Sequence, residues 1–469
     1  MPDAVQTAAD IRSGRVTAVE TVQQALRAIE EIDSELNAFT VTSPAEALVK
    51  AREADERVRR GDDLPALHGV PVSVKDHIWM AGKPATNGSL ALRDFVPDAD
   101  CVAVERLRAA GAIVVGKTNN PEFCYRGFTD NLVYGLTRNP WDLDRTPGGS
   151  SGGAGASVAA GLTPIALGTD GGGSIRIPAS FCCVFGYKPT FGLVPTRPGF
   201  GGWKTLSVHG PLTRTVRDAA VALQVMAGPS AEDDMTWPVP RGDLDAIAGE
   251  GSLRGVRIAA SEDLGWAPVE PDVRAAFRRA VDVLARAGAI VVEAAPRTPY
   301  PTELWNTIAL CEGYVSEGAL LEHWADRMSP GIAQIVAAGR DIPAARYVEA
   351  MHERAAYTAT WSRFFDHHDV MVTPMMQLTA FPVDVPSPEA IDGVAIDPFF
   401  DDWCTLALPA NLTGQPAASV PVGVGNDGLP VAMQVMGPRF ADATVLAVAA
   451  AYEALAPWID RWPPLTSGA

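Results

Sequence analysis

The sequence predicts an α/β protein with a mixed central β-sheet and helices on both faces. Compact β-branched runs such as Ile113–Lys117 alternate with helical segments such as Val102–Ala110, which is typical of βαβ units. The chain has 469 residues, of which 47 % are hydrophobic and 20 % charged, as in globular proteins. A chain of this length can bury most of its surface and enclose a site, and we expect residues 1–469 to form a single domain.

The first 65 residues are predicted to be helical. Apolar side chains recur at intervals of three and four residues from Val19 to Ile29, which indicates a helix with one buried face. Thr17 lies two residues before this run, and Glu20 lies three residues after Thr17, which is the spacing of a capping box. A second helical pattern with a charged outer face comes next. We expect this segment to pack on the core formed by residues 66–220.

Two glycine loops lie in that core. Val70, Val72 and Val74 alternate with other residues, which predicts a short strand that delivers Lys75 at its end. The first loop is TPGGSSGGAG at 146–155, and the second is TDGGGSIRIP at 169–178. Between them the sequence predicts a short helix at 156–161 and a short strand at 164–168.

The part from 221 to 469 is predicted to complete the sheet and the substrate pocket. Residues 228–255 are rich in Pro, Asp and Gly and are a candidate linker or surface excursion. The predicted elements are strands at 256–260, 289–292 and 370–373, helices at 273–287 and 441–455, and a hairpin-like pair at 417–422 and 431–436.

Charge and cysteine content exclude several classes of function. The formal net charge is −18, so the chain repels phosphate backbones and nucleic acid is not an expected partner. None of the six cysteines forms a C-x-x-C pair, so we expect reduced, mostly buried thiols and no metal site. No secretory signal or stretch long enough to span a bilayer is visible, so the expected location is cytoplasmic, with no membrane partner.

Glycine-rich loops bind phosphate in some folds, and this alternative is tested first. A P-loop requires a lysine after its glycines, and none follows Gly148–Gly153. The dinucleotide motif requires an acidic residue about twenty positions on, at a strand end. Asp170 has about that spacing but lies inside the second glycine loop. A non-catalytic nucleotide-binding protein therefore stays a weaker hypothesis.

Nucleophilic catalysis is the second interpretation of these loops. Ser174 follows three glycines, Gly171, Gly172 and Gly173. Residues without side chains let backbone N–H groups converge on one point, as a tetrahedral oxyanion requires. A flexible turn is the alternative explanation of these glycines.

A nucleophilic serine needs a base. None of the seven histidines lies in the two loops, and the G-x-S-x-G elbow is not matched around Ser174. Lysine is the remaining candidate, but free lysine titrates near about 10.4 and must be desolvated to act as a neutral base. Lys75 ends an apolar strand that would bury its stem, although a structural lysine paired with Asp76 would give the same pattern.

Together these segments resemble the amidase signature family. The matching segments are LHGVPVSVKDHIWMAG at 67–82, GAIVVGKTNNPEF at 111–123, TRNPWDLDRTPGGSSGGAGASVAAG at 137–161 and GTDGGGSIRIPASFCCVFGYKPT at 168–190. The flanking segments fit as well, so the resemblance runs from about residue 8 to residue 455. It implies the amidase signature fold and hydrolysis of carbon–nitrogen bonds other than peptide bonds.

The resemblance also implies a role for each matching residue. Lys75 matches the family's catalytic base, Ser150 its bridging serine after a cis peptide bond, and Ser174 its nucleophile. An acyl-enzyme intermediate follows from these roles. The implied oxyanion hole consists of the N–H groups of Gly171, Gly172, Gly173 and Ser174. The implied supporting residues are Ser151 and Thr169, which resemble hydrogen-bonding partners, and the ion pair of Asp170 with Arg176.

The expected substrate is a small aryl or alkyl amide, with carbamates (a urethanase activity) and esters left open. The family's pocket segments nominate Cys124, Tyr125, Phe200, Trp203, Trp305 and Phe381 as substrate-binding residues. The nearest rival is the A subunit of a glutamine-dependent transfer-RNA amidotransferase, which works with partner subunits. The segment at 302–324 departs from the usual pattern of that rival, which favours a free-standing amidase. The resemblance implies no cofactor, and many relatives form homodimers.

Overall fold

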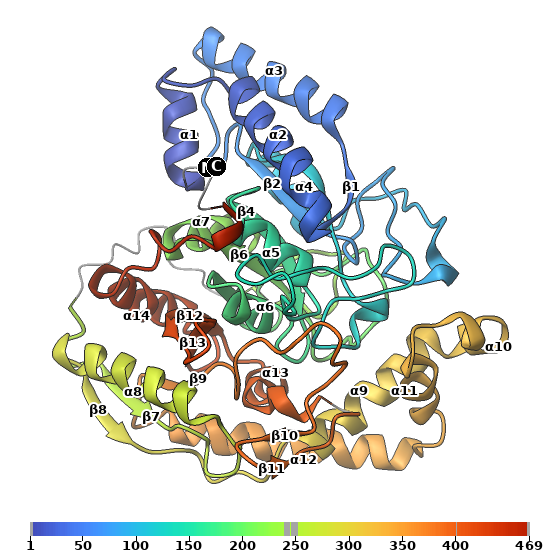
Figure 1. The fold of residues 1–469 in the computed structure, drawn as a ribbon, viewed down its shortest axis with the longest axis vertical. Coiled ribbons are helices and arrows are strands. Elements are labelled where there is room, and N and C mark those ends of the chain that lie inside the picture. The colour runs from blue at the N-terminus through green and yellow to red at the C-terminus, as the bar shows by residue number, and fades with distance from the viewer. Residues whose placement is uncertain (1–2, 239–243, 245–251, 400, 467–469) are drawn as a thin grey trace.

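The computed structural model describes residues 3–238, 244, 252–399 and 401–466, and its centre is one large mixed sheet (Figure 1). Of the predicted linker at 228–255, residues 239–243 and 245–251 lie outside the described residues. The strands of the large sheet are β1 (Phe39–Thr42), β2 (Pro71–Lys75), β3 (Ile113–Thr118), β4 (Ile165–Asp170), β5 (Phe185–Lys188), β6 (Val208–Thr213), β7 (Arg257–Ala260), β8 (Ile290–Glu293), β9 (Val370–Pro374), β12 (Ala417–Val424) and β13 (Pro430–Met436). A separate small pair is formed by β10 (Ala390–Ile391) and β11 (Val394–Ala395).

The large sheet combines parallel and antiparallel pairs. In the described part of the chain its order is β1-β3-β2-β4-β6-β5-β12-β13-β9-β7-β8. Strand β2 is parallel to both β3 and β4, and β7 is parallel to both β8 and β9, whereas the remaining pairs are antiparallel. The parallel register pairs Val74 with Leu167, so the carboxyl ends of β2 and β4 meet at one edge of the sheet. That edge carries Lys75 and the second glycine loop.

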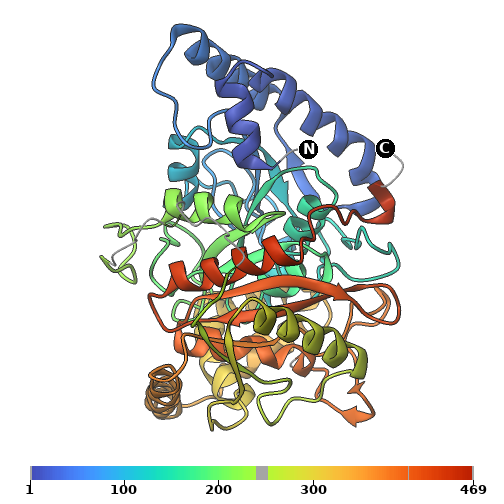
Figure 2. The same ribbon diagram turned by 90° about the vertical axis from the view of Figure 1, so that its left-hand side faces the viewer.

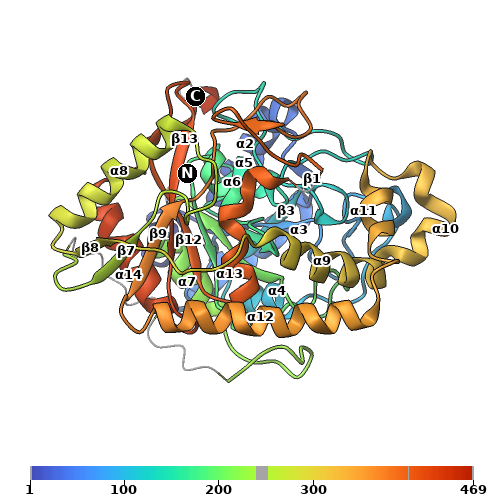
Figure 3. The same cartoon turned by 90° about the horizontal axis from the view of Figure 1, so that it is seen from below.

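Helices cover both faces of this sheet, as predicted. They are α1 (Ala4–Arg12), α2 (Ala18–Leu36), α3 (Pro44–Arg60), α4 (Val102–Ala109), α5 (Gly152–Ala159), α6 (Arg176–Phe181), α7 (Val216–Met226), α8 (Pro271–Arg286), α9 (Thr302–Glu317), α10 (Leu321–Trp324), α11 (Ile332–Ala338), α12 (Ala344–Phe364), α13 (Leu408–Thr413) and α14 (Asp442–Leu455). Seen from below, α8 and α14 lie on one side of β12 and β13, and α6 and α13 lie on the other (Figure 3). In the side view, α14 runs across the long red strands β12 and β13 (Figure 2).

Local signals explain where several elements begin. Thr17 accepts a hydrogen bond from the Glu20 N–H, and the Glu20 carboxylate accepts one from the Thr17 N–H, so the predicted capping box starts α2. The helix predicted at 156–161 begins earlier, at Gly152. A Cβ atom at Gly152 would overlap the Thr129 side chain, and one at Gly153 would overlap a backbone oxygen. These glycines therefore belong to a buried, closely packed helix and not to a flexible loop.

The prediction that the first 65 residues are helical is wrong for β1, and two further strands, β5 and β6, and several helices had no sequence prediction. Strand β1 has only four residues, β5 contains a glycine, and β6 contains the Gly-Pro pair at 210–211, which is typical of turns. The helices α6, α7 and α9 to α13 lie where the sequence analysis named no elements. The elements predicted at 102–110, 113–117, 256–260, 273–287, 289–292, 370–373, 417–422, 431–436 and 441–455 are confirmed within one or two residues.

The six cysteines are unpaired, and Cys101, Cys182, Cys183 and Cys404 are buried. In the described residues, no helix has the length and apolar character that crossing a membrane requires.

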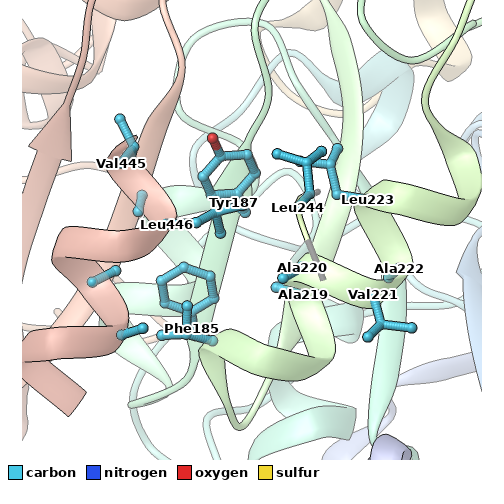
Figure 4. Packing of buried hydrophobic residues seen from close by; sticks show 14 of the residues in the cluster. Phe185, Tyr187, Ala219, Ala220, Val221, Ala222, Leu223, Leu244, Val445 and Leu446 are labelled. Carbon is cyan, nitrogen blue, oxygen red and sulfur yellow. The ribbon is translucent and has the colours of Figure 1, made fainter. Parts of the chain in front are cut away.

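The largest hydrophobic cluster joins the sheet to α7 and α14. Phe185 and Tyr187, on β5, stack with ring centroids 6.2 Å apart. The two side chains lie between α7, which contributes Leu223, and α14, which contributes Leu446 (Figure 4). All four side chains are fully buried, so this cluster fixes the helical layer against the middle of the sheet.

We expect Phe185→Ala to lower the free energy of unfolding by about 3–5 kcal/mol, because it leaves a cavity in a fully buried cluster. Val315→Ala is the control, since Val315 is 87 % exposed and its change should stay under about 0.5 kcal/mol. Chemical denaturation of both variants measures the difference. Equal destabilisation by the two changes would contradict the packing described here.

Candidate active site

Lys75 lies where the sequence placed it, at the end of β2. All five residues of β2 are buried, and the Lys75 side chain is fully enclosed. Its Nζ is 2.7 Å from Ser150 Oγ and 2.8 Å from Thr169 Oγ1. The alternative interpretation, a structural ion pair with Asp76, is wrong: the Asp76 carboxylate accepts hydrogen bonds from Thr86, and Lys75 is hydrogen-bonded to two hydroxyl groups instead.

Burial holds the pKa of Lys75 below its ordinary value, because an ammonium loses its hydration there. The thiol of Cys124 opposes this shift, as a negative charge on it would favour the ammonium. Burial also raises the pKa of the Cys124 thiol, but a charged Lys75, the nearby His77 and a hydrogen bond with Ser150 outweigh burial and lower that pKa to about 6. Lys75 is fully enclosed, whereas Cys124 is partly exposed at the cavity, so the cost of burying a charge falls mainly on the ammonium and favours the neutral amine. The amine is therefore suited to act as a base.

Ser150 lies in the first glycine loop and is completely buried. The peptide bond between Gly149 and Ser150 is cis, as the resemblance implied. A Cβ atom at Gly149 would lie 2.8 Å from backbone atoms of Phe128, so only glycine fits there. The neighbouring Ser151 ties the loop to β4, because its hydroxyl donates to the Thr169 carbonyl and accepts from the Thr169 N–H, both at 3.2 Å.

Ser174 lies in the second glycine loop, two residues before the start of α6, and is 7 % exposed. The Ser151 N–H donates to the Ser174 carbonyl at 3.1 Å, which holds the two glycine loops together. Ser150 and Ser174 line the same cavity. In the described part of the chain, however, no hydrogen bond joins their hydroxyl groups. Catalytic hydrogen bonds of enzymes without substrate are often long, so this geometry is compatible with a relay.

The glycines before Ser174 serve two purposes. A Cβ atom at Gly171 would lie 2.6 Å from Trp203, and one at Gly172 would lie 2.8 Å from Trp305, so both positions let an indole ring rest on the loop. Gly173 has a φ of +119°, a backbone conformation that favours glycine. Its N–H donates to the Asp170 carboxylate at 2.9 Å. The donors left for an oxyanion are then those of Gly171, Gly172 and Ser174.

A buried ion pair holds this loop in place. Arg176 donates to both Asp170 carboxylate oxygens at 2.9 Å, and both side chains have no exposed surface. Burial opposes the ionisation of Asp170, but the Arg176 guanidinium outweighs it and holds the pKa of this carboxyl below its ordinary range. Arg176 also donates to Asn411 Oδ1 at 2.6 Å and Gln434 Oε1 at 2.5 Å, which connects the loop to α13 and β13.

Two cavities meet at Ser174. The first is partly open, and its space of about 670 Å³ includes the solvent in its mouth. Its walls are mainly apolar or aromatic, with Tyr125, Ile177, Trp203, Trp305 and Leu408 among them. The rings of Tyr125 and Trp203 are 5.2 Å apart, and those of Trp203 and Trp305 are 5.0 Å apart, both edge to face. We name this space the apolar cavity.

The second cavity encloses about 610 Å³ including its mouth and is more polar. Both cavities are lined by Cys124, Tyr125, Ser174 and Trp203. Ser150 lines the second cavity but not the apolar cavity. Its further lining residues include His77, Thr169, Arg197, Phe200, Lys204, Ser207, His209 and Glu317. We name this space the polar cavity.

A family model described as Amidase matches residues 20–446 of the chain. The chain belongs to the amidase signature family. This amidase is therefore a hydrolase that acts on carbon–nitrogen bonds other than peptide bonds.

Individual relatives match over nearly the whole amidase. The "Acylamidase" of Rhodococcus erythropolis is 35 % identical over 98 % of this chain and 96 % of its own length. The A subunit of the glutamyl-tRNA(Gln) amidotransferase of Chloroflexus aggregans is 37 % identical over 97 % of this chain and 96 % of its own length. Among solved structures, a bacterial aryl acylamidase of the amidase signature enzymes superposes with a TM-score of 0.93 at 31 % identity, covering 100 % of this chain and 99 % of that one.

The nominated substrate-binding residues of the amidase fall into three groups. Cys124, Tyr125, Trp203 and Trp305 line the apolar cavity. Phe200 lines the polar cavity, where its ring packs 5.5 Å from His77. Phe381 is nominated wrongly, since it packs on Phe181 and Trp403 in a buried cluster and lines neither cavity. The sequence around Phe381 contains no pattern that indicates this packing.

Three residues of the polar cavity, His77, His209 and Glu317, were not predicted from the sequence. His77 follows Lys75 by two residues, so its place after a predicted strand end was the available signal. Glu317 lies on α9, far from the glycine loops in sequence, and no local pattern indicates its position. In the described residues, no group of three or more His, Cys, Asp or Glu side chains is placed to hold a metal ion.

We expect Arg176→Leu to lower the free energy of unfolding by about 3–5 kcal/mol, because it leaves the Asp170 carboxylate buried without its cation. Arg278→Leu is the control, since Arg278 pairs with Glu262 on the surface and should barely change stability. Chemical denaturation compares the two. A loss no larger than that of the surface variant would show that the pair does not hold the loop.

Proposed function

We propose that this chain is a free-standing amidase that hydrolyses the C–N bond of a small aryl or alkyl amide through Lys75, Ser150 and Ser174. One observation supports the proposal above all. The fully buried Lys75, whose pKa is lowered, lies 2.7 Å from the hydroxyl of the buried Ser150, and Ser174 lies in the neighbouring glycine loop. A charge-neutral amine in that place has a lone pair for accepting a proton. The relatives named as acylamidases support the same reaction.

The proposed mechanism has two halves. The neutral Lys75 amine takes the proton of Ser150, Ser150 takes the proton of Ser174, and the Ser174 oxygen attacks the amide carbonyl. Backbone N–H groups of the glycine loop stabilise the oxyanion. The proton then returns through Ser150 to the leaving nitrogen, the C–N bond breaks, and an acyl-enzyme remains. Water attacks the acyl-enzyme through the same relay and releases the acid.

The apolar cavity supports an aryl or alkyl acyl group as the substrate. Trp203, Trp305 and Leu408 can enclose such a group and exclude water from it. Carbamates and esters present a similar carbonyl to the same serine, so they are further candidate substrates. An activity screen over aryl amides, aliphatic amides, carbamates and esters decides the class.

A second candidate is the A subunit of a glutamine-dependent transfer-RNA amidotransferase. The relative from Chloroflexus aggregans, at 37 % identity, favours it. That function requires partner subunits, whereas a free-standing amidase works alone. Assay of the purified chain on simple aryl amides separates the two: turnover without partners supports the amidase, and turnover of glutamine only with partner subunits supports the amidotransferase. Family membership overturns the non-catalytic nucleotide-binding hypothesis.

Other properties stay predictions. A single amidase domain, a homodimer, a cytoplasmic location, the absence of a cofactor and the absence of a nucleic-acid partner rest on the sequence alone.

We expect Ser174→Ala and Lys75→Ala each to lower kcat by about four to six orders of magnitude, because each removes one member of a catalytic unit. Ser13→Ala and Lys50→Ala are exposed matched controls and should keep wild-type rates. Rates on an aryl amide, with circular dichroism to check folding, measure the effect. Wild-type turnover by the Ser174→Ala protein would remove the mechanism.

The pH dependence follows from the lowered pKa of Lys75. A base must be unprotonated, so kcat/KM should rise with pH through the Lys75 pKa and then level off. Because burial lowers that pKa, the midpoint should fall clearly below 10.5, the ordinary lysine value. A pH–rate profile on a substrate without ionisable groups measures this midpoint. A rise that continues to the ordinary lysine range would mean that the amine stays protonated.

A further inference from the structure

Glu317 is a buried carboxyl that the proposed reaction does not use. It is the last residue of α9, is only 5 % exposed, and lines the polar cavity. The Tyr125 hydroxyl donates to its Oε2 at 3.0 Å. In the described part of the chain, Glu317 takes part in no ion pair with a lysine, an arginine or a histidine. A buried carboxylate without a cation is costly, so such a group stays protonated more readily unless a ligand contributes a cation or hydrogen-bond donors.

The position of Glu317 is fixed by the helix on which it lies. Gly313 is one turn before Glu317 on the same face of α9. A Cβ atom at Gly313 would overlap the Tyr125 hydroxyl, so only glycine leaves room for the tyrosine to reach Glu317. Ser316 fixes the adjacent loop, because its hydroxyl accepts the Gly202 N–H at 2.9 Å. The Tyr125 hydroxyl and the place of Glu317 on α9 therefore fix the position of the carboxyl.

The polar cavity lies on the side of the leaving group. Ser150 returns the proton to the leaving nitrogen in the proposed mechanism, and Ser150 lines the polar cavity but not the apolar cavity. The acyl group therefore occupies the apolar cavity, and the amine extends into the polar cavity toward Glu317. This step rests on the proposed function.

The charged groups around Glu317 leave its carboxyl available for a substrate. Arg197 donates to the carbonyls of Gly199, Phe200 and Gly201, and Lys204 pairs with Asp234 at 2.8 Å, so both cations have partners. Burial lowers the pKa of His209 to about 3, so this ring is neutral. Burial raises the pKa of Glu317 to about 7, while Ser316, Tyr125 and His77 act in the opposite direction and Cys124 adds to the increase.

We propose that Glu317, positioned by Tyr125, selects substrates whose leaving amine carries a second hydrogen-bond donor or a positive charge. The class comprises monoamides of diamines and anilides with an amino substituent. The far end of such an amine would donate to the Glu317 carboxylate inside the polar cavity. A charge-assisted hydrogen bond of this kind changes affinity or kcat/KM by about 10- to 100-fold.

The test compares matched substrates in matched variants. An N-(2-aminoethyl) amide is compared with the N-propyl amide of the same acid, and a 4-aminoanilide with the 4-methylanilide. The wild-type enzyme should prefer the donor-bearing member of each pair by about tenfold or more in kcat/KM. Glu317→Gln keeps an acceptor for Tyr125 and should lose most of the preference for the cation while it still hydrolyses the 4-methylanilide. Glu303→Gln, on the exposed side of α9, is the control.

Two further readouts separate selection from structure. The preference for the cationic substrate should increase as the pH rises through about 7, the pKa of Glu317, and this increase should vanish in Glu317→Gln. Binding of 1,2-diaminoethane and of the uncharged propan-1-ol, measured by calorimetry, needs no hydrolysis. A wild-type preference for the diamine that Glu317→Gln abolishes supports the proposal even if the enzyme hydrolyses no amide in the screen.

The outcomes distinguish the two proposals. If the amides are hydrolysed with equal kcat/KM within each pair, and 1,2-diaminoethane binds no better than propan-1-ol, Glu317 does not select the leaving group, and the amidase mechanism stands. If no amide is hydrolysed but the diamine binds through Glu317, the proposed substrates are wrong and the amine site stands. A Glu317→Gln protein that keeps the full wild-type preference overturns the inference directly.

Discussion

The structure depends on keeping one lysine amine out of water. Lys75 ends a strand whose residues are all buried, between two parallel neighbours, so its side chain can point only into the protein. A neutral amine has two N–H donors and one lone pair. Thr169 Oγ1 at 2.8 Å can accept one donor, and the Ser150 hydroxyl at 2.7 Å can donate to the lone pair. The strand end, the cis peptide loop and β4 must all be in place before these contacts exist.

The buried ion pair of Asp170 and Arg176 helps the Lys75 amine to remain neutral. Burial lowers the pKa of Lys75, whereas the Asp170 carboxylate acts to raise it, because a negative charge favours a nearby ammonium. Arg176 binds both oxygens of that carboxylate and so compensates most of its negative charge. Asn411 adds a further donor to Asp170 at 3.0 Å. The pair therefore does more than brace the loop, since it screens the base from a charge that would protonate it.

The sequence predicted those features that local patterns encode. Alternating valines gave β2 and the place of Lys75, and the second glycine loop gave Ser174, whereas Ser150 came only from the resemblance to the amidase signature family. Contacts between distant segments were not predictable in this way. Tyr125 and Glu317 are 192 positions apart and meet only because α9 packs beside the segment after β3. Phe381 was predicted to bind substrate because it is an aromatic residue in an expected pocket segment. It packs in a buried hydrophobic cluster instead.

The two cavities at Ser174 suggest how the proposed reaction keeps its order. Apolar walls hold an acyl group and offer few polar partners to water, so hydrolysis from that side is disfavoured. The polar cavity borders Ser150, the relay that must activate the second nucleophile. Departure of the amine vacates this space, and water entering it meets the relay that has just delivered its proton. The same side chains can then serve both halves of the reaction, because acylation and deacylation proceed from the same side of the carbonyl.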